Sequence, residues 1–129
     1  TVVIANRTLD RAVELARHFE ALQSCAPRGF EARAYGALAG LHFDIVVNAT
    51  SAGLEGAMPD LPTEAFATGA LAYDMVYARR TPFLDFARER GARVCDGIGM
   101  LVEQAAESFF IWRGVRPQTA PVIALLRSA

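Results

Sequence analysis

Short apolar runs alternate along the chain with longer stretches in which apolar residues recur every three or four positions. The first pattern is typical of buried strands, and the second is typical of helices packed by one face. From Leu9, for example, apolar residues recur at Ala12, Val13, Ala16 and Phe19. The pattern predicts strands over residues 2–5, 31–35, 43–48, 70–75 and 92–95, helices starting at residues 9, 82, 100 and 119, and loops over 23–29 and 49–62.

Alternating strands and helices with short connections predict a parallel, doubly wound α/β sheet. Ligands bind such sheets at the carboxyl ends of the strands. The segments 6–8, 48–51, 74–77 and 96–100 follow predicted strands and are therefore expected to line one edge. No glycine-rich phosphate loop follows the first strand of this chain. We therefore expect a Rossmann-like sheet that lacks its first strand and that loop, followed by two C-terminal helices.

Two arginines, Arg7 and Arg11, lie where the first predicted strand ends and the first predicted helix begins. A cation near a helix N-terminus is mildly unfavourable, by roughly 0.3–1 kcal/mol, so an anion is expected there. In a dinucleotide fold this position meets the adenosine ribose, and an arginine there accommodates the 2′-phosphate of NADP. Thr8 could add a hydroxyl or backbone donor. The alternative is that Arg11 pairs with Glu14 or is solvated on the helix face.

The composition narrows the choice of function. All 13 basic residues are arginine, so this chain holds no lysine base. A net charge of −1 gives no basic field for nucleic acid, and no apolar run is long enough to span a membrane. Cys25 and Cys95 are expected to be free thiols in a reducing, cytoplasmic compartment, and His18 and His42 form no metal-ligand pattern. Because the chain starts inside a strand pattern without Met, we expect a longer protein with no signal peptide.

Five motifs together resemble the shikimate dehydrogenase family in order and spacing. They are Asn6-Arg7-Thr8-x-x-Arg11-Ala12, Asn48-Ala49-Thr50-Ser51-Ala52-Gly53, Tyr73-Asp74-Met75-Val76-Tyr77, Thr81-Pro82-Phe83-Leu84 and Asp96-Gly97-Ile98-Gly99-Met100-Leu101-Val102-x-Gln104-Ala105. Each motif alone is weak, but the set runs nearly from the first residue to the last. The chain resembles the carboxyl-terminal half of that enzyme.

The resemblance implies NADP(H)-dependent reduction of 3-dehydroshikimate to shikimate, in aromatic amino-acid biosynthesis. It implies that residues 1–99 form a partial NADP-binding domain and that the helices of 100–129 pack toward an N-terminal substrate domain. That missing domain would carry the catalytic Lys–Asp pair, and this chain would hold no catalytic residue and no metal. The implied cofactor-binding residues are Asn6, Arg7, Thr8 and Arg11 at the adenosine phosphate and Thr50, Met75, Gly97 and Met100 near the nicotinamide, with Tyr77 and Gln104 reaching the substrate.

Read without the family, several of these residues have simpler interpretations. Gly97 could serve only to start a helix, and Tyr77 could be a packing residue. Gln104 could lie at the rim of a helix face. Asp74 and Asp96 resemble a carboxylate pair, but we favour turn and capping roles for both.

Other functions remain open at this point. Glutamyl-tRNA reductase also has a strand ending in Asn-Arg-Thr, but it lacks the later motifs, and tRNA would favour a more basic chain. A quinate/shikimate dehydrogenase would be expected to carry an acid near Arg7 if it tolerates NAD. A non-catalytic NADPH-binding module is the third alternative, and the absence of lysine is compatible with it.

Overall fold

The computed structural model describes residues 1–21 and 29–128. Cys25 and most of the predicted loop at 23–29 lie outside the described residues. The strands are β1 (Val2–Ala5), β2 (Phe30–Arg33), β3 (Phe43–Asn48), β4 (Phe66–Asp74) and β5 (Arg93–Cys95), and the α-helices are α1 (Leu9–Ala21), α2 (Pro82–Glu89), α3 (Ile98–Arg113) and α4 (Ala120–Ser128). Two short 3₁₀ turns, Tyr35–Leu38 and Ala52–Glu55, were not predicted.

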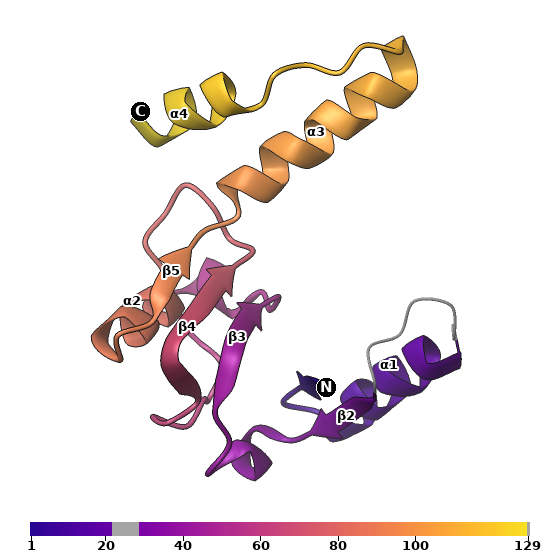
Figure 1. Cartoon of the computed structure of the whole chain (residues 1–129). Coiled ribbons are helices and arrows are strands. Elements are labelled where there is room, and N and C mark those ends of the chain that lie inside the picture. The colour runs from indigo at the N-terminus through magenta and orange to yellow at the C-terminus, as the bar shows by residue number, and fades with distance from the viewer. Residues whose placement is uncertain (22–28, 129) are drawn as a thin grey trace.

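The strands form two parallel sheets. β1 pairs with β2, while β3, β4 and β5 pair in that order. In Figure 1, α1 lies beside the β1–β2 pair and α2 lies beside β4 and β5. The arrows of β3, β4 and β5 point toward α3, so the two C-terminal helices lie beyond the carboxyl ends of these strands. The predicted α/β architecture is confirmed.

The break between the sheets lies between β1 and β3. Within the described residues no ladder joins these two strands. A cavity of about 350 Å³ is lined by residues of both, among them Val3 and Ile4 of β1 and Ile45 and Val47 of β3. Ile45 and Val47 are 61% and 56% exposed, although both are large apolar residues of a strand. On the side of β3 that faces away from β4, no strand pairs with it among the described residues.

The core lies between β4, β5 and α2. It joins Phe66, Ala70, Ala72, Phe83, Leu84, Ala87 and Ala92. The hydroxyl of Thr81 accepts from the backbone N–H of Leu84 and Pro82 stands at the first turn, so α2 begins where the capping pattern predicts. Gly91 follows the helix with a positive φ of 75°, a conformation that favours glycine.

Strand β4 begins four residues before the predicted start at residue 70. Phe66 is buried and stands opposite Phe43, which extends the pairing beyond the apolar run. The register shifts between Phe43 and Ile45, and Gly69 in β4 has a φ of 77°. A glycine inside a strand weakens the sequence signal, because it commonly marks an irregularity of this kind.

The C-terminal helices leave a large apolar surface. No residue of α4 is buried, and only Ile98, Val102 and Ala106 are buried in α3. The exposed apolar side chains of α3, α4 and their connection are Phe109, Phe110, Ile111, Trp112, Val115, Val122, Leu125 and Leu126. Exposed patches of this kind mark interaction surfaces. None of the described helices is long and apolar enough to cross a membrane.

Candidate cofactor site

Three polar residues end the strands that face the site. Asn6 follows β1, Asn48 ends β3 and Asp74 ends β4. Asn48 and Asp74 are opposite each other in the parallel register, and both are almost completely buried. The backbone N–H of Met75 donates to the carbonyl of Asn48 at 3.0 Å, so the carboxyl ends of β3 and β4 stay together beyond their last paired residues. The predicted alignment of these segments along one edge is confirmed for β3 and β4.

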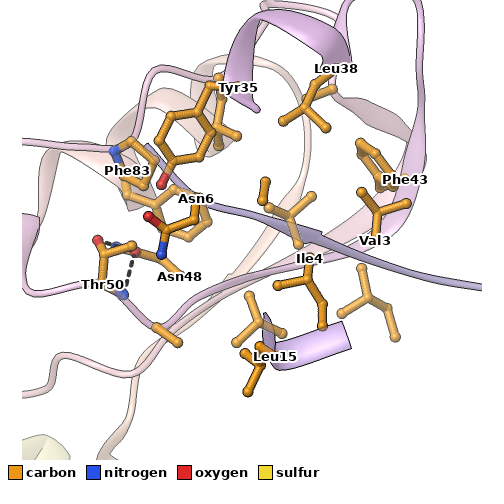
Figure 2. Close-up of a pocket in the computed structure, with 18 residues that line it drawn as sticks. Val3, Ile4, Asn6, Leu15, Tyr35, Leu38, Phe43, Asn48, Thr50 and Phe83 are labelled. Carbon is orange, nitrogen blue, oxygen red and sulfur yellow. Dashed lines mark hydrogen bonds between the residues drawn. The ribbon is translucent and has the colours of Figure 1, made fainter. Parts of the chain in front are cut away.

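Thr50 is held in one orientation by the side chain of Asn48. The Asn48 Oδ1 accepts from the backbone N–H of Thr50 at 3.1 Å and from its hydroxyl at 2.8 Å (Figure 2). The Thr50 hydroxyl in turn accepts from the backbone N–H of Ala52 at 3.3 Å. The loop after β3 is thereby turned by side-chain bonds that its sequence supplies locally.

A second cavity, of about 470 Å³, opens between the loops that follow β3 and β4. Thr50, Met75 and Tyr77 all line it, together with Ala49 and residues 76, 78 and 79. Met75 and Tyr77 are 40% and 44% exposed, so neither is a core packing residue in this chain. We call this cavity the β3–β4 cleft. It brings together three of the residues that the sequence indicated at the nicotinamide and substrate.

Gly97 lies against the backbone of Met75. Its N–H donates to the carbonyl of Val76 at 3.2 Å. A Cβ at position 97 would lie 2.9 Å from the carbonyl carbon of Met75 and closer still to its oxygen. The close neighbour at Gly97 is therefore the loop after β4, whereas a Cβ at Gly99 would have no atom within 4 Å. Met100 follows in the first turns of α3 and is partly buried.

The arginines at the end of β1 are exposed. Asn6 accepts from the backbone N–H of Thr8 at 2.9 Å, and the N–H of Arg11 donates to the carbonyl of Thr8 at 3.1 Å. Among the described residues neither Arg7 nor Arg11 makes an ion pair, so a pair between Arg11 and Glu14 is absent there. Asn6 therefore shapes the turn, while the two guanidinium groups face solvent.

Sequence reasoning missed Tyr35, which follows β2 and lines the 350 Å³ cavity with Asn6. Figure 2 shows its ring directed toward Asn6. Burial raises the pKa of the Tyr35 phenol, and the nearby charge of Arg7 opposes that rise. A single tyrosine after a weak strand carries no signal in the sequence. Only the pairing of β2 with β1 places it beside the arginine segment.

Gln104 is not among the residues that line the β3–β4 cleft. It is exposed on α3, where the carbonyl of its backbone accepts from the Ser108 hydroxyl at 2.9 Å. Asp96 lies one residue before Gly97, the N-cap of α3, and accepts from the N–H of Ile98 at 3.3 Å in a turn. Helix α3 begins two residues before the predicted start. Asp74 accepts from the N–H of Val76 at 3.1 Å. The turn interpretation is confirmed for both aspartates, but neither is the N-cap of a helix.

The described residues contain no cluster of three His, Cys, Asp or Glu side chains that could hold a metal ion. Cys95 is a free, partly buried thiol.

Comparison with known proteins shows which family the chain resembles along its length. The family model described as Shikimate 5'-dehydrogenase C-terminal domain matches residues 97–127. Over 129 aligned residues the chain is 58% identical to a shikimate dehydrogenase (NADP(+)) of Halorhodospira halophila, covering 98% of this chain and 45% of that one. The chain matches the carboxyl-terminal half of shikimate dehydrogenases. It spans about half the length of the curated relatives it matches.

Solved structures show the same relation. An Ael1 enzyme from Pseudomonas putida superimposes with a TM-score of 0.84 at 48% identity, over 96% of this chain and 44% of that one. The shikimate dehydrogenase of Thermus thermophilus, solved with NADP(H) and shikimate, superimposes with a TM-score of 0.78 at 33% identity, over 98% of this chain and 45% of that one. The Rossmann-like fold of the shikimate dehydrogenase half is thereby confirmed.

Proposed function

We propose that this chain is the NADP-binding half of an enzyme that reduces 3-dehydroshikimate to shikimate. One observation carries the proposal. The chain is similar throughout to the second half of NADP-dependent shikimate dehydrogenases, and its motif residues Thr50, Met75 and Tyr77 line one cleft. A cytoplasmic location is part of the proposal, because the free thiol of Cys95 suits a reducing compartment.

The residues present fit NADP(H), which supplies the hydride when bound. Arg7 and Arg11 are exposed and have no carboxylate partner among the described residues, so a 2′-phosphate can take their forked hydrogen bonds. Thr8 lies between them at the start of α1. We assign the nicotinamide end to the β3–β4 cleft, with Thr50 and Met75 on its walls, Gly97 against the backbone of Met75, and Met100 in the first turn of α3.

We place the proton-transfer groups outside this chain, in an N-terminal domain. The sequence has no lysine, so a lysine base must come from elsewhere. The apolar surface of α3 and α4 is a suitable contact for that domain, because eight large apolar side chains there are exposed without it. In this proposal α3 carries Gln104 toward a substrate held between the two halves.

A rate assay on the complete parent chain tests the function. Shikimate and quinate are each offered with NADP and with NAD. We expect turnover with shikimate and NADP only. Turnover with quinate or NAD would assign the protein to quinate/shikimate dehydrogenases. NADP binding without any turnover would instead indicate a non-catalytic NADPH-binding module.

Tyr77 and Gln104 are expected to act on the substrate and not on the cofactor. In the complete enzyme, Tyr77→Phe or Gln104→Ala should raise the KM for shikimate about two- to tenfold, the equivalent of one neutral hydrogen bond. The KM for NADP should change less than twofold. Steady-state kinetics with each substrate varied in turn measures both values. An unchanged KM for shikimate in both variants would remove these residues from the substrate site.

The gap between β1 and β3 is expected to be filled by an upstream strand in the complete chain. Val47→Ser should then lower the free energy of unfolding of the complete protein by about 1–3 kcal/mol, as in a core, although Val47 is 56% exposed here. Leu9→Ser, at the exposed start of α1, should cost less than about 0.5 kcal/mol. Urea denaturation of both variants measures the difference. Equal small effects would mean that nothing covers this part of β3.

A further inference from the structure

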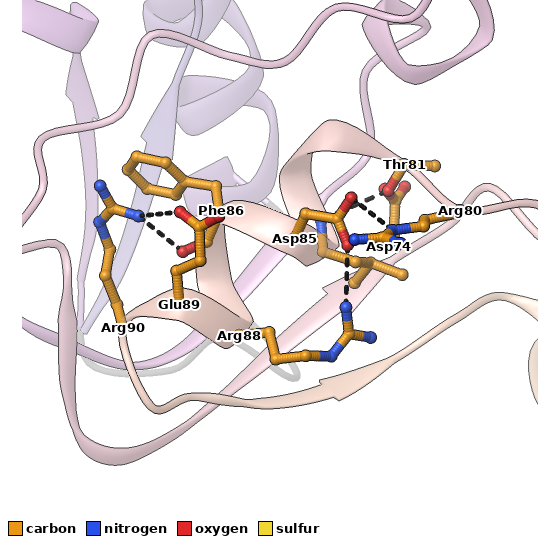
Figure 3. Close-up of polar contacts among 9 residues, drawn as sticks. Asp74, Arg80, Thr81, Asp85, Phe86, Arg88, Glu89 and Arg90 are labelled. Carbon is orange, nitrogen blue, oxygen red and sulfur yellow. Dashed lines mark hydrogen bonds and ion pairs between the residues drawn. The ribbon is translucent and has the colours of Figure 1, made fainter.

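Asp74 is a carboxylate with no exposed surface at the end of β4. Its Oδ1 accepts from the Asn48 side-chain amide at 3.3 Å and from the backbone N–H of Val76 at 3.1 Å. Its Oδ2 accepts from the Thr81 hydroxyl at 2.6 Å, the contact drawn in Figure 3. No ion pair of Asp74 occurs among the residues that the structure describes. Three hydrogen bonds therefore compensate the burial of this carboxylate.

The bond from Asn48 to Asp74 decides which way the Asn48 amide faces. The Nδ2 of Asn48 donates to the Oδ1 of Asp74, so the NH₂ group of this amide points toward the carboxyl group. The amide oxygen of Asn48 is then left to face Thr50, where it accepts both the backbone N–H and the hydroxyl. Without Asp74, this hydrogen bond would no longer fix which end of the Asn48 amide faces Thr50.

The same oxygen of Asp74 holds the opposite wall of the β3–β4 cleft. The N–H of Val76 lies between Met75 and Tyr77, both of which line the cleft. Thr50 lies on the other wall, formed by the loop after β3. Two hydrogen bonds connect it to Asp74, one from Asn48 to Asp74 and one from Thr50 to Asn48. The second oxygen serves another purpose, because Thr81 caps α2 and lies outside the residues that line the cleft.

We propose that Asp74 is a positioning residue for the cofactor. Through Asn48 it orients Thr50, and through Val76 it sets the loop that carries Met75 and Tyr77. The nicotinamide end of NADP therefore meets a cleft whose two walls are held by one carboxylate oxygen. The inference rests on the proposed function, since it assigns the cleft to NADP.

The test compares three variants of the complete parent chain by calorimetric titration with NADP and by thermal melting. Asp74→Ala should weaken NADP binding about tenfold, because both walls lose their anchor. Asp74→Asn should rescue binding to within about twofold of the parent, since its amide oxygen can still accept from Asn48 and Val76 while its NH₂ faces Thr81. Thr81→Val is the matched control: it removes the Oδ2 bond and the α2 cap but leaves both Oδ1 bonds in place, and should lower the melting temperature without changing NADP affinity.

A second set of variants tests the proposal if Asp74→Ala does not fold. Asn48→Ala removes the side chain that connects Asp74 to Thr50, and should also weaken NADP binding about tenfold. In a Thr50→Ala background it should add little further loss, because both changes act on one arm. If the losses of NADP affinity in Asn48→Ala and Thr50→Ala simply add, the proposal is wrong. It is also wrong if Asn48→Ala or Asp74→Ala binds NADP as tightly as the parent while its melting temperature falls as in Thr81→Val.

The two levels of inference fail in different ways. If the parent chain does not oxidise shikimate with NADP, the proposed reaction is wrong. The affinity series still judges Asp74, because it measures binding and not turnover. If the parent chain is active but NADP affinity is the same in Asp74→Ala, Asp74→Asn and Thr81→Val, Asp74 has a structural role only, and the positioning proposal is wrong.

Discussion

Replacing Arg7 or Arg11 with alanine in the complete protein is expected to raise the KM for NADP about 10- to 100-fold each. A hydrogen bond to a charged group contributes about 1.5–3 kcal/mol, and both residues are proposed to hold the same 2′-phosphate. The KM for NAD should change less than twofold, because NAD has a hydroxyl in place of that phosphate. Steady-state kinetics with each cofactor measures the ratio.

The structure gives this expectation its physical basis. Both arginines stand near the N-terminus of α1, where a positive charge is unfavourable and an anion is favoured. Neither is paired with a carboxylate among the described residues. A bound phosphate would satisfy the helix N-terminus and the two guanidinium groups together.

Arg17→Ala is the matched control for the arginine variants. Arg17 is exposed on the same helix and its loss changes the net charge equally, but it lies roughly 9 Å further along the axis than Arg11. It should leave the KM for NADP within twofold of the parent. Equal losses for NADP and NAD in Arg7→Ala and Arg11→Ala would show that the arginines do not read the 2′-phosphate.

The fold could be predicted from the sequence where apolar runs are long or capped. Four of the six residues in 43–48 are apolar and the segment forms β3, and the Thr81–Pro82 start of α2 is a local signal. The early start of β4 was missed because Gly69 interrupts the apolar run and the pairing partner, Phe43, is distant in sequence. Local signals therefore gave the elements, but not how far the ladder between them extends.

The site divides in the same way. The bond from Val76 to Asp74 spans two residues, and a turn role for Asp74 could be read from the sequence. Its bond with Asn48 spans 26 residues and depends on the register of β3 against β4. Its bond with Thr81 spans 7 residues and joins the end of β4 to the start of α2. A pattern of neighbouring residues in the sequence does not predict contacts of this kind. Tyr35 was missed for this reason too, since only the pairing of β1 with β2 brings it beside Asn6.

Gly97 is the position where the smallest change should have a large effect. Gly97→Ala in the complete protein is expected to lower the free energy of unfolding by about 1–3 kcal/mol, the usual cost of forcing an extra methyl group into a packed site. It should also weaken NADP binding at least about tenfold, because the displaced backbone carries Met75. Thermal melting and calorimetric titration with NADP measure the two effects.

The clash at Gly97 has no easy relief, because the atoms that the added methyl group meets are backbone atoms of Met75. The Met75 N–H is bonded to the carbonyl of Asn48, and the next N–H, that of Val76, is bonded to Asp74. Moving Met75 away from a Cβ at position 97 would therefore strain the same bonds that hold the β3–β4 cleft. The φ of Gly97 is −77°, which alanine adopts readily, so the effect would come from the contact and not from the backbone conformation.

Gly99→Ala separates this contact from a general effect of alanine in α3. A Cβ at position 99 meets nothing within 4 Å, and alanine in a helix is favoured over glycine by about 0.5–1 kcal/mol. Gly99→Ala should thus melt at or above the temperature of the parent protein. If Gly97→Ala melts as high as Gly99→Ala and binds NADP equally well, the loop after β4 moves freely, and the close approach of α3 does not hold the cleft in place.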